Sequence, residues 1–201
     1  MLAYPVSKKP IDYNDKVFIQ PKLDGVRCLI QYDEKGEFEG NGVKAYSRTG
    51  KEWKNINHIL IELRPFFMKF PNIVLDGELY NHDFKDNFEE IISMVRKQKP
   101  TEEDRSKAHK NVQFHCYDLI DTKISFKTRD EFIKEHVPKS YCVKHVLTMP
   151  VPNPGALHYV HGSNIESGYE GSIVRLNTEY ECKRSHSLRK FKEFHDAEAQ
   201  I

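Results

Sequence analysis

The segment Lys22-Leu23-Asp24-Gly25-Val26-Arg27 joins two runs, residues 17–20 and 26–32, whose β-branched and aromatic side chains predict strands. An amine acts as a nucleophile only when its pKa falls well below the ordinary value, through desolvation or neighbouring cations. A lysine at a strand end, followed by a glycine turn, suits that requirement, and Asp24 and Arg27 lie close enough in sequence to assist. A surface hairpin turning at Asp-Gly fits the same residues, so the segment alone leaves both interpretations open.

Further short runs of the same composition predict the remaining strands. They lie at residues 73–80, 112–118, 143–149 and 172–176. Strands and helices do not alternate strictly along the chain, which argues against a doubly wound parallel sheet and favours an α+β fold with antiparallel sheets flanked by helices. A chain of 201 residues buries a sizeable core without disulfides, and we predict a single domain over residues 1–201.

Helical periodicity appears in three segments. They are residues 55–70, 84–98 and 128–137. Pro65 is expected to bend or end the first helix, and Asp83 is suited to cap the second. Thr128 and Glu131 form a capping-box pattern at the start of the third. Residues 96–110 are highly charged and have no apolar period, so we predict a mobile loop there.

Composition argues against several classes of protein. The four cysteines lack the short paired spacing of zinc ligands, so reduced, buried thiols are expected. No apolar run approaches the roughly 20 residues that span a bilayer, and residues 1–10 lack the apolar core of a signal peptide. We therefore expect a cytoplasmic monomer without a membrane partner, or a protein of the nucleus or host cytoplasm if the source is eukaryotic or viral.

Charge is nearly balanced, with 31 basic and 30 acidic residues, and gives no global sign of a nucleic-acid partner. The distribution is more informative, because the run from Lys183 to Lys192 contains basic residues and no acidic one. Taken alone, such a run is most simply a solvated charged face.

The pattern Lys-x-Asp-Gly-x-Arg at residues 22–27 resembles the nucleotidyl-accepting motif of the covalent nucleotidyltransferases, which include DNA ligases, RNA ligases and mRNA capping enzymes. Five later segments resemble further motifs of that superfamily, in the family's order. They are Tyr46-Ser47-Arg48-Thr49-Gly50, Leu75-Asp76-Gly77-Glu78-Leu79, Phe114-His115-Cys116-Tyr117-Asp118, Glu170-Gly171-Ser172-Ile173-Val174-Arg175 and Leu188-Arg189-Lys190-Phe191-Lys192. Each alone has an ordinary alternative, such as a turn at Asp-Gly-Glu, and only their joint order supports the resemblance.

The resemblance implies the adenylation domain of an ATP-dependent DNA ligase, with a ligase-type, ATP-grasp-like core. In such enzymes the lysine takes AMP from ATP, AMP passes to the 5′-phosphate of nicked duplex DNA, and the 3′-hydroxyl then expels AMP and seals the nick. The implied catalytic residues are Lys22, Asp24, Lys190 and Lys192. The implied nucleotide-binding residues are Arg27, Arg48, Glu78, Tyr117 and Ile173 or Val174. The implied Mg²⁺ ligands are Glu170 and Glu78, and the implied contacts with nick phosphates are Lys183, Arg184 and Arg189.

Alternatives within and outside the superfamily remain. An RNA ligase is the leading alternative. A DNA ligase is favoured over it by Leu23, the following Asp-Gly and Arg175. A capping enzyme needs to select guanine, and no residue indicates that. A non-catalytic nucleic-acid-binding module with this fold is the alternative from another class. The presence of Lys22, Arg27, Glu78, Glu170 and both late lysines argues against it.

Family ligases usually continue into an OB-fold domain that carries a sixth motif. The chain ends at residues 196–201, about where that domain begins, so we expect a catalytic domain without its OB-fold, with slow self-adenylylation. Few residues precede Lys22, which leaves no room for the N-terminal domain of NAD⁺-dependent ligases. ATP is therefore the expected AMP donor.

Overall fold

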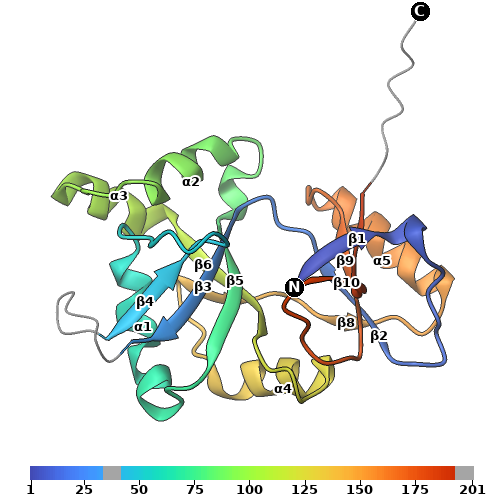
Figure 1. Ribbon diagram of the computed structural model, residues 1–201. Coiled ribbons are helices and arrows are strands. Elements are labelled where there is room, and N and C mark those ends of the chain that lie inside the picture. Colours follow the sequence, from blue (N-terminus) through green and yellow to red (C-terminus); the bar gives the residue numbers. More distant parts are fainter. Residues whose placement is uncertain (34–41, 193–201) are drawn as a thin grey trace, which may run out of the picture. The chain divides into compact units, whose positions relative to one another are not determined.

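A computed structural model of the protein describes residues 1–33 and 42–192; the terminal residues 196–201 discussed above lie outside this part. The chain divides into two compact units (Figure 1). Unit 1 contains residues 1–22, 148–177 and the chain from Glu181 onward, and unit 2 contains residues 23–147 and 178–180. Each unit is described separately, and the single domain over residues 1–201 remains a prediction.

Unit 1 is built on a five-stranded sheet in the order β1-β10-β9-β2-β8. β1 pairs with β10 in parallel, and the other neighbours are antiparallel. One α-helix, α5, packs on this sheet (Figure 1). The elements are β1 (Leu2–Pro5), η1 (Val6–Lys8), β2 (Val17–Pro21), β8 (Met149–Pro150), α5 (Pro154–Glu166), β9 (Ser172–Leu176) and β10 (Arg184–Phe191).

The core of unit 1 is small and lies between the sheet and α5. Its buried members are Val17, Ile19, Val151, Leu157 and Val174. Because successive side chains of a strand point to opposite faces, the neighbours of these residues along β2 and β9 point to the other face of the sheet.

Unit 2 is larger, with a five-stranded sheet in the order β4-β3-β5-β6-β7, of which only the β6–β7 pair is parallel. Its strands are β3 (Val26–Tyr32), β4 (Val43–Tyr46), β5 (Val74–Tyr80), β6 (Gln113–Leu119) and β7 (Val143–His145). Its helices are α1 (Asn57–Lys69), η2 (His82–Phe84), α2 (Phe88–Val95), α3 (Glu102–Asn111) and α4 (Phe126–His136). Helices flanking two largely antiparallel sheets confirm the predicted α+β class.

Three predicted helix boundaries differ from the structure. α1 continues through Pro65 to Lys69, because Phe66 and Phe67 beyond the proline are buried in the core. Asp83 does not cap α2, which begins only at Phe88. In α4 the cap is Ser125, whose hydroxyl accepts from the backbone N–H of Thr128, so Thr128 lies in the first turn instead.

The mobile loop predicted at residues 96–110 is wrong, because α3 occupies most of it. A capping box between Thr101 and Asp104 starts this helix, and only Ala108 of its residues is buried, so no apolar period announces it. α5 was also not predicted; Asn153 caps it and Pro154 is its first residue. Among residues 1–33 and 42–192, no helix combines the length and apolar character needed to cross a bilayer.

Candidate active site

The connection from Lys22 to Gly25 is not a hairpin, because β2 and β3 belong to different sheets. At its start, the backbone N–H of Lys22 donates to the carbonyl of Gly171 at 2.9 Å, which ties the lysine to the residue before β9. At its end, a Cβ on Gly25 would lie 2.5 Å from the carbonyl oxygen of Leu79 and 2.7 Å from Cγ of Glu78. Only glycine allows the chain to pass this close to β5.

In unit 1, Glu170 is bonded to two of the predicted catalytic lysines. Its Oε2 accepts from Nζ of Lys22, and its Oε1 accepts from Nζ of Lys192. The three side chains are between 20% and 39% exposed, so they are shielded but still reachable by a charged ligand. Two ammonium groups around one carboxylate leave a local excess of positive charge, which favours binding of a polyphosphate.

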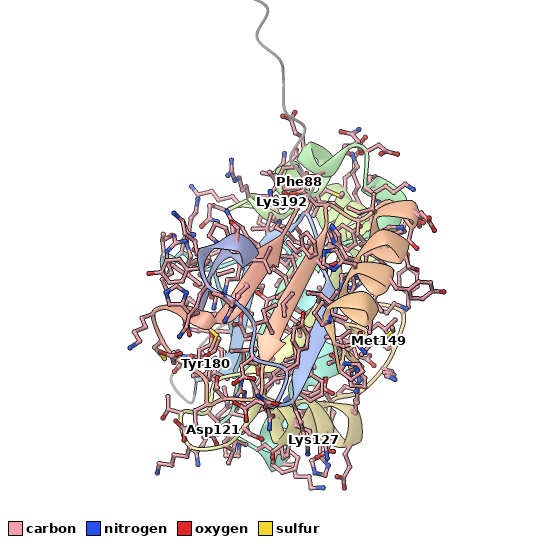
Figure 2. The ribbon with its side chains drawn as sticks, turned by 90° about the vertical axis from the view of Figure 1, so that its right-hand side faces the viewer. Phe88, Asp121, Lys127, Met149, Tyr180 and Lys192 are labelled. Carbon is pink, nitrogen blue, oxygen red and sulfur yellow. The ribbon has the colours of Figure 1, made fainter. Side chains whose placement is uncertain are left out.

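Gly171 explains how Glu170 reaches Lys192. Its φ of +148° is rarely adopted by other residues, and a Cβ there would overlap the carbonyl oxygen of Phe191. The start of β9 therefore lies directly against the end of β10, and the residues just beyond, Glu170 and Lys192, meet. Lys192 is labelled at this end of the strand in Figure 2.

The strand register separates Ile173 from Val174. Ile173 pairs with Lys190 of β10, on the face of the sheet that α5 does not cover. Val174 is fully buried in the core of unit 1. Of the two residues predicted to pack on the adenine, the structure leaves Ile173 with an accessible side chain and excludes Val174.

A second layer of polar residues supports this end of the sheet from α5. Asn164 donates to the hydroxyl of Ser172 at 2.9 Å, and Nδ1 of His161 lies 3.0 Å from the same oxygen. The His161 ring stacks on Phe191, with 3.7 Å between ring centroids. Sequence analysis missed these α5 residues, since the helix itself was not predicted.

In unit 2, three predicted nucleotide-binding residues lie on neighbouring strands. Arg27 of β3 faces Glu78 of β5 in the pairing register, and the hydroxyl of Tyr117 on β6 lies 3.5 Å from Oε2 of Glu78. Residues 75–79 run through the middle of β5, so the alternative of an Asp-Gly-Glu turn is wrong. Glycine is needed at position 77 because the ring of Phe114 fills the space of a Cβ.

Asp76 holds Arg27 and was not singled out from the sequence. The Nε and Nη2 groups of Arg27 donate to Oδ1 and Oδ2 of Asp76 at 2.9 and 2.8 Å, and this carboxylate is only 3% exposed. Burial disfavours the charged guanidinium, but the adjacent carboxylate outweighs it and raises the pKa of Arg27 above its ordinary value. Arg27 is therefore a fixed positive group. The sequence pointed to Asp76 only as the aspartate of the Leu-Asp-Gly-Glu motif.

Asp24 and Arg48 both have exposed side chains. Arg48 lies in a turn in which the N–H of Gly50 donates to the carbonyl of Ser47 at 3.0 Å. The structure therefore places both residues in unit 2 and gives neither a buried partner among residues 1–33 and 42–192.

The three cations predicted to contact nick phosphates differ in their surroundings. Lys183 is exposed and pairs with Glu181 at 3.3 Å, and Arg184 is exposed and donates to the carbonyl of Ala3. Arg189 is 2% exposed, and its guanidinium donates to three backbone carbonyls, those of Lys9, Pro10 and His186. The prediction for Arg189 is therefore corrected: its guanidinium is buried and anchors the N-terminal segment, so it is not available to a nick phosphate.

The described residues, 1–33 and 42–192, contain no group of three or more His, Cys, Asp or Glu side chains suited to a metal ion. Mg²⁺ commonly takes one or two protein carboxylates and completes its shell with water and substrate phosphates. Glu170, beside two lysines that attract phosphate, fits that mode of binding.

Comparison with protein families gives one match, the ATP dependent DNA ligase domain, over residues 1–192. The chain belongs to the ATP dependent DNA ligase domain family. Comparison with curated proteins gave no match for this ligase domain. The family assignment favours a DNA ligase over the RNA ligase and capping enzyme alternatives.

Solved structures share the fold of this ligase domain. Pmar-Lig_Pre is 26% identical with a TM-score of 0.70, and the match covers 96% of this chain and 46% of that one. Chlorella virus DNA ligase-adenylate is 19% identical with a TM-score of 0.64, covering 96% and 66%. The ATP-dependent DNA ligase of bacteriophage T7, in complex with ATP, is 16% identical with a TM-score of 0.65, covering 95% and 67%. The chain thus spans less than half of Pmar-Lig_Pre.

Proposed function

We propose that this ligase domain transfers AMP from ATP to Lys22 and then to the 5′-phosphate of a nick in duplex DNA. The observation that carries the proposal is the cluster in which Glu170 bonds both Lys22 and Lys192, in a chain matched by the ligase family over residues 1–192. No separate observation favours a second function.

In the first step, a bond forms between Nζ of Lys22 and the α-phosphorus as the bond to the bridging oxygen breaks, and pyrophosphate leaves. Lys22 must lose a proton before it attacks, and the carboxylate of Glu170 lies in hydrogen-bond contact with Nζ to receive it. Lys190 and Lys192 supply positive charge to the phosphate oxygens, because phosphoryl transfer depends chiefly on positioning and charge neutralisation. When bound, Mg²⁺ held by Glu170 would add to that neutralisation.

Nucleotide recognition is assigned to unit 2. Arg27 and Glu78 suit the ribose hydroxyls, one as a hydrogen-bond donor and the other as an acceptor. The half-buried ring of Tyr117 suits stacking on the adenine. Ile173 keeps the role at the base that the family resemblance implies. Glu78 also remains the second proposed ligand of Mg²⁺, and Arg48 and Asp24 keep their proposed roles at the nucleotide.

Nick binding is assigned to Lys183 and Arg184, the two exposed cations of the late basic run. Contacts of this kind release counterions, so DNA affinity is expected to fall steeply between low and physiological salt. Affinity that is indifferent to salt over this range contradicts the assignment. Arg189→Gln is not a suitable DNA-binding variant, because it disturbs the anchored N-terminal segment.

Mass spectrometry of the protein after incubation with ATP and Mg²⁺ tests the proposal most directly. An added AMP on the peptide that contains Lys22 is the expected result, and its absence, or its presence on another residue, refutes the assignment. Parallel reactions with ATP and GTP distinguish a ligase from a capping enzyme. Nicked DNA against nicked RNA then distinguishes a DNA ligase from an RNA ligase.

A further inference from the structure

Residues Thr178–Tyr180 belong to unit 2, although they lie in sequence between two strands of unit 1, β9 and β10. None of the motifs found in the sequence includes them. Tyr180 is 2% exposed, while connections between strands usually run over the surface. A buried phenol needs hydrogen-bond partners, and those of Tyr180 are informative.

The hydroxyl of Tyr180 contacts both members of the Arg27–Asp76 pair. It donates to Oδ2 of Asp76 at 2.7 Å and accepts from Nη2 of Arg27 at 2.8 Å. Burial, followed by the adjacent Asp76 carboxylate, raises the pKa of Tyr180 above its ordinary value, so the hydroxyl keeps its proton at neutral pH. The guanidinium of Arg27 thus contacts both oxygens of the Asp76 carboxylate and the phenol oxygen of Tyr180.

Other contacts hold the 178–180 segment in place without using this hydroxyl. The N–H of Tyr180 donates to the carbonyl of Asp121 at 3.1 Å; both residues are labelled in Figure 2. Arg129 donates to the carbonyl of Thr178 at 3.0 Å, and its guanidinium carbon lies 5.7 Å from the centre of the Tyr180 ring. Removing the hydroxyl alone should therefore leave the segment folded.

We propose that Tyr180 is a positioning residue for the nucleotide, acting through Arg27. A guanidinium is planar, and bonds on two of its nitrogens from two directions fix the plane in which its remaining N–H groups point. The hydroxyl thereby orients Arg27 toward the ribose and does not itself touch the nucleotide. This inference rests on the proposed function, in which Arg27 binds a ribose hydroxyl.

Tyr180→Phe tests the proposal in two measurements. In calorimetric titrations without metal, the Kd for ATP should rise about tenfold, as expected for loss of a hydrogen bond to a charged group. The same titrations are made with 2′-deoxy-ATP and with 3′-deoxy-ATP. One of these two analogues lacks the hydroxyl that Arg27 binds, and that analogue should bind equally tightly to the wild type and to Tyr180→Phe. In adduct formation with Mg²⁺, the KM for ATP should rise while the rate at saturating ATP stays near that of the wild type.

Two controls separate positioning from a merely structural role. Tyr80→Phe removes another buried hydroxyl of unit 2, bonded to Nδ1 of His82 at 2.7 Å, and should leave ATP affinity unchanged. Arg27→Lys combined with Tyr180→Phe should bind ATP no more weakly than Arg27→Lys alone, since the hydroxyl then has no guanidinium to orient.

The proposal is overturned if Tyr180→Phe leaves ATP affinity unchanged, or weakens all three nucleotides equally, or if Tyr80→Phe weakens ATP as much. A wild-type protein that binds ATP but forms no lysyl adduct refutes the proposed function, and the binding comparison still decides the role of Tyr180. A wild-type protein that binds no ATP refutes both.

Discussion

An ion-paired cluster in unit 1 and a buried ion pair in unit 2 differ in their exposure to solvent. In unit 1, Glu170 shares its carboxylate between Lys22 and Lys192, and all three side chains keep contact with solvent. In unit 2, Asp118 and Arg129 form a pair that is no more than 1% exposed. Charges near water exchange partners at little cost, whereas a buried pair must stay paired. The difference fits the proposal that the Glu170 cluster of unit 1 serves the reaction, whereas the Asp118–Arg129 pair holds the fold of unit 2.

The largest expected effect is the loss of adduct formation when Lys22 of unit 1 is replaced. Lys22→Ala should abolish labelling by [α-³²P]ATP, and Lys22→Arg should be equally inactive, because a guanidinium stays protonated and cannot attack phosphorus. Thermal unfolding of both variants should stay near that of the wild type, since the side chain is partly exposed. Label on either variant shows that another residue is the nucleophile.

A second prediction compares the two kinds of pair directly. Asp118→Asn leaves the charge of Arg129 buried and poorly compensated, and should lower the free energy of unfolding by about 3–5 kcal/mol. Glu170→Gln, the matched change in unit 1, should cost less than about 1 kcal/mol while impairing adduct formation. Denaturant unfolding measures both. Equal losses of stability would remove the distinction between the two ion pairs.

A third prediction concerns pH. Burial, with Lys144 and His82 nearby, lowers the pKa of His115 in unit 2 to about 4 from its ordinary 6.5. As the pH falls, His115 therefore takes up a proton in the unfolded chain before it does so in the folded protein. Its contribution to the free energy of unfolding is complete above pH 6.5 and is lost progressively toward pH 4. The loss reaches about 2 kcal/mol at pH 5.

Unfolding at pH 7.5 and pH 5 measures this contribution. His115→Gln should lose less stability than the wild type between the two, whereas His158→Gln, at an exposed position of α5 in unit 1, should behave as the wild type. His58 and His145 of unit 2 also have pKa values lowered mainly by burial, so part of the pH dependence should persist in His115→Gln.

The smallest expected effect concerns α3, a part of unit 2 that buries only Ala108. Thr101→Ala removes the capping box and should lower the free energy of unfolding by about 1 kcal/mol. Thr128→Ala in α4 should cost less, because Ser125 is the cap there. A greater loss for Thr128→Ala would mean that the cap geometry differs in solution.

Sequence alone was sufficient where chemistry and local pattern coincide. The order of the motifs led to the ligase family and to Lys22, and runs of β-branched and aromatic residues predicted most strands, including β3 and β5. Helix limits were less predictable, because Phe66 and Phe67 carry α1 past Pro65 by burial, and α3 depends on a local cap. Propensity is a weak guide wherever tertiary packing decides the outcome.

The sequence by itself led to the proposed class of reaction. It did so through the residues at positions 22, 78, 170, 190 and 192. Only the tertiary structure decided which side chains are buried and hold other residues in place, and which remain accessible to a ligand. The bonds of Arg189 to the carbonyls of Lys9 and Pro10, the burial of Val174 in the core, and the contact of Tyr180 with Arg27 all join residues far apart in the chain. No local pattern encodes such contacts, because they arise when separate strands pack and exclude water.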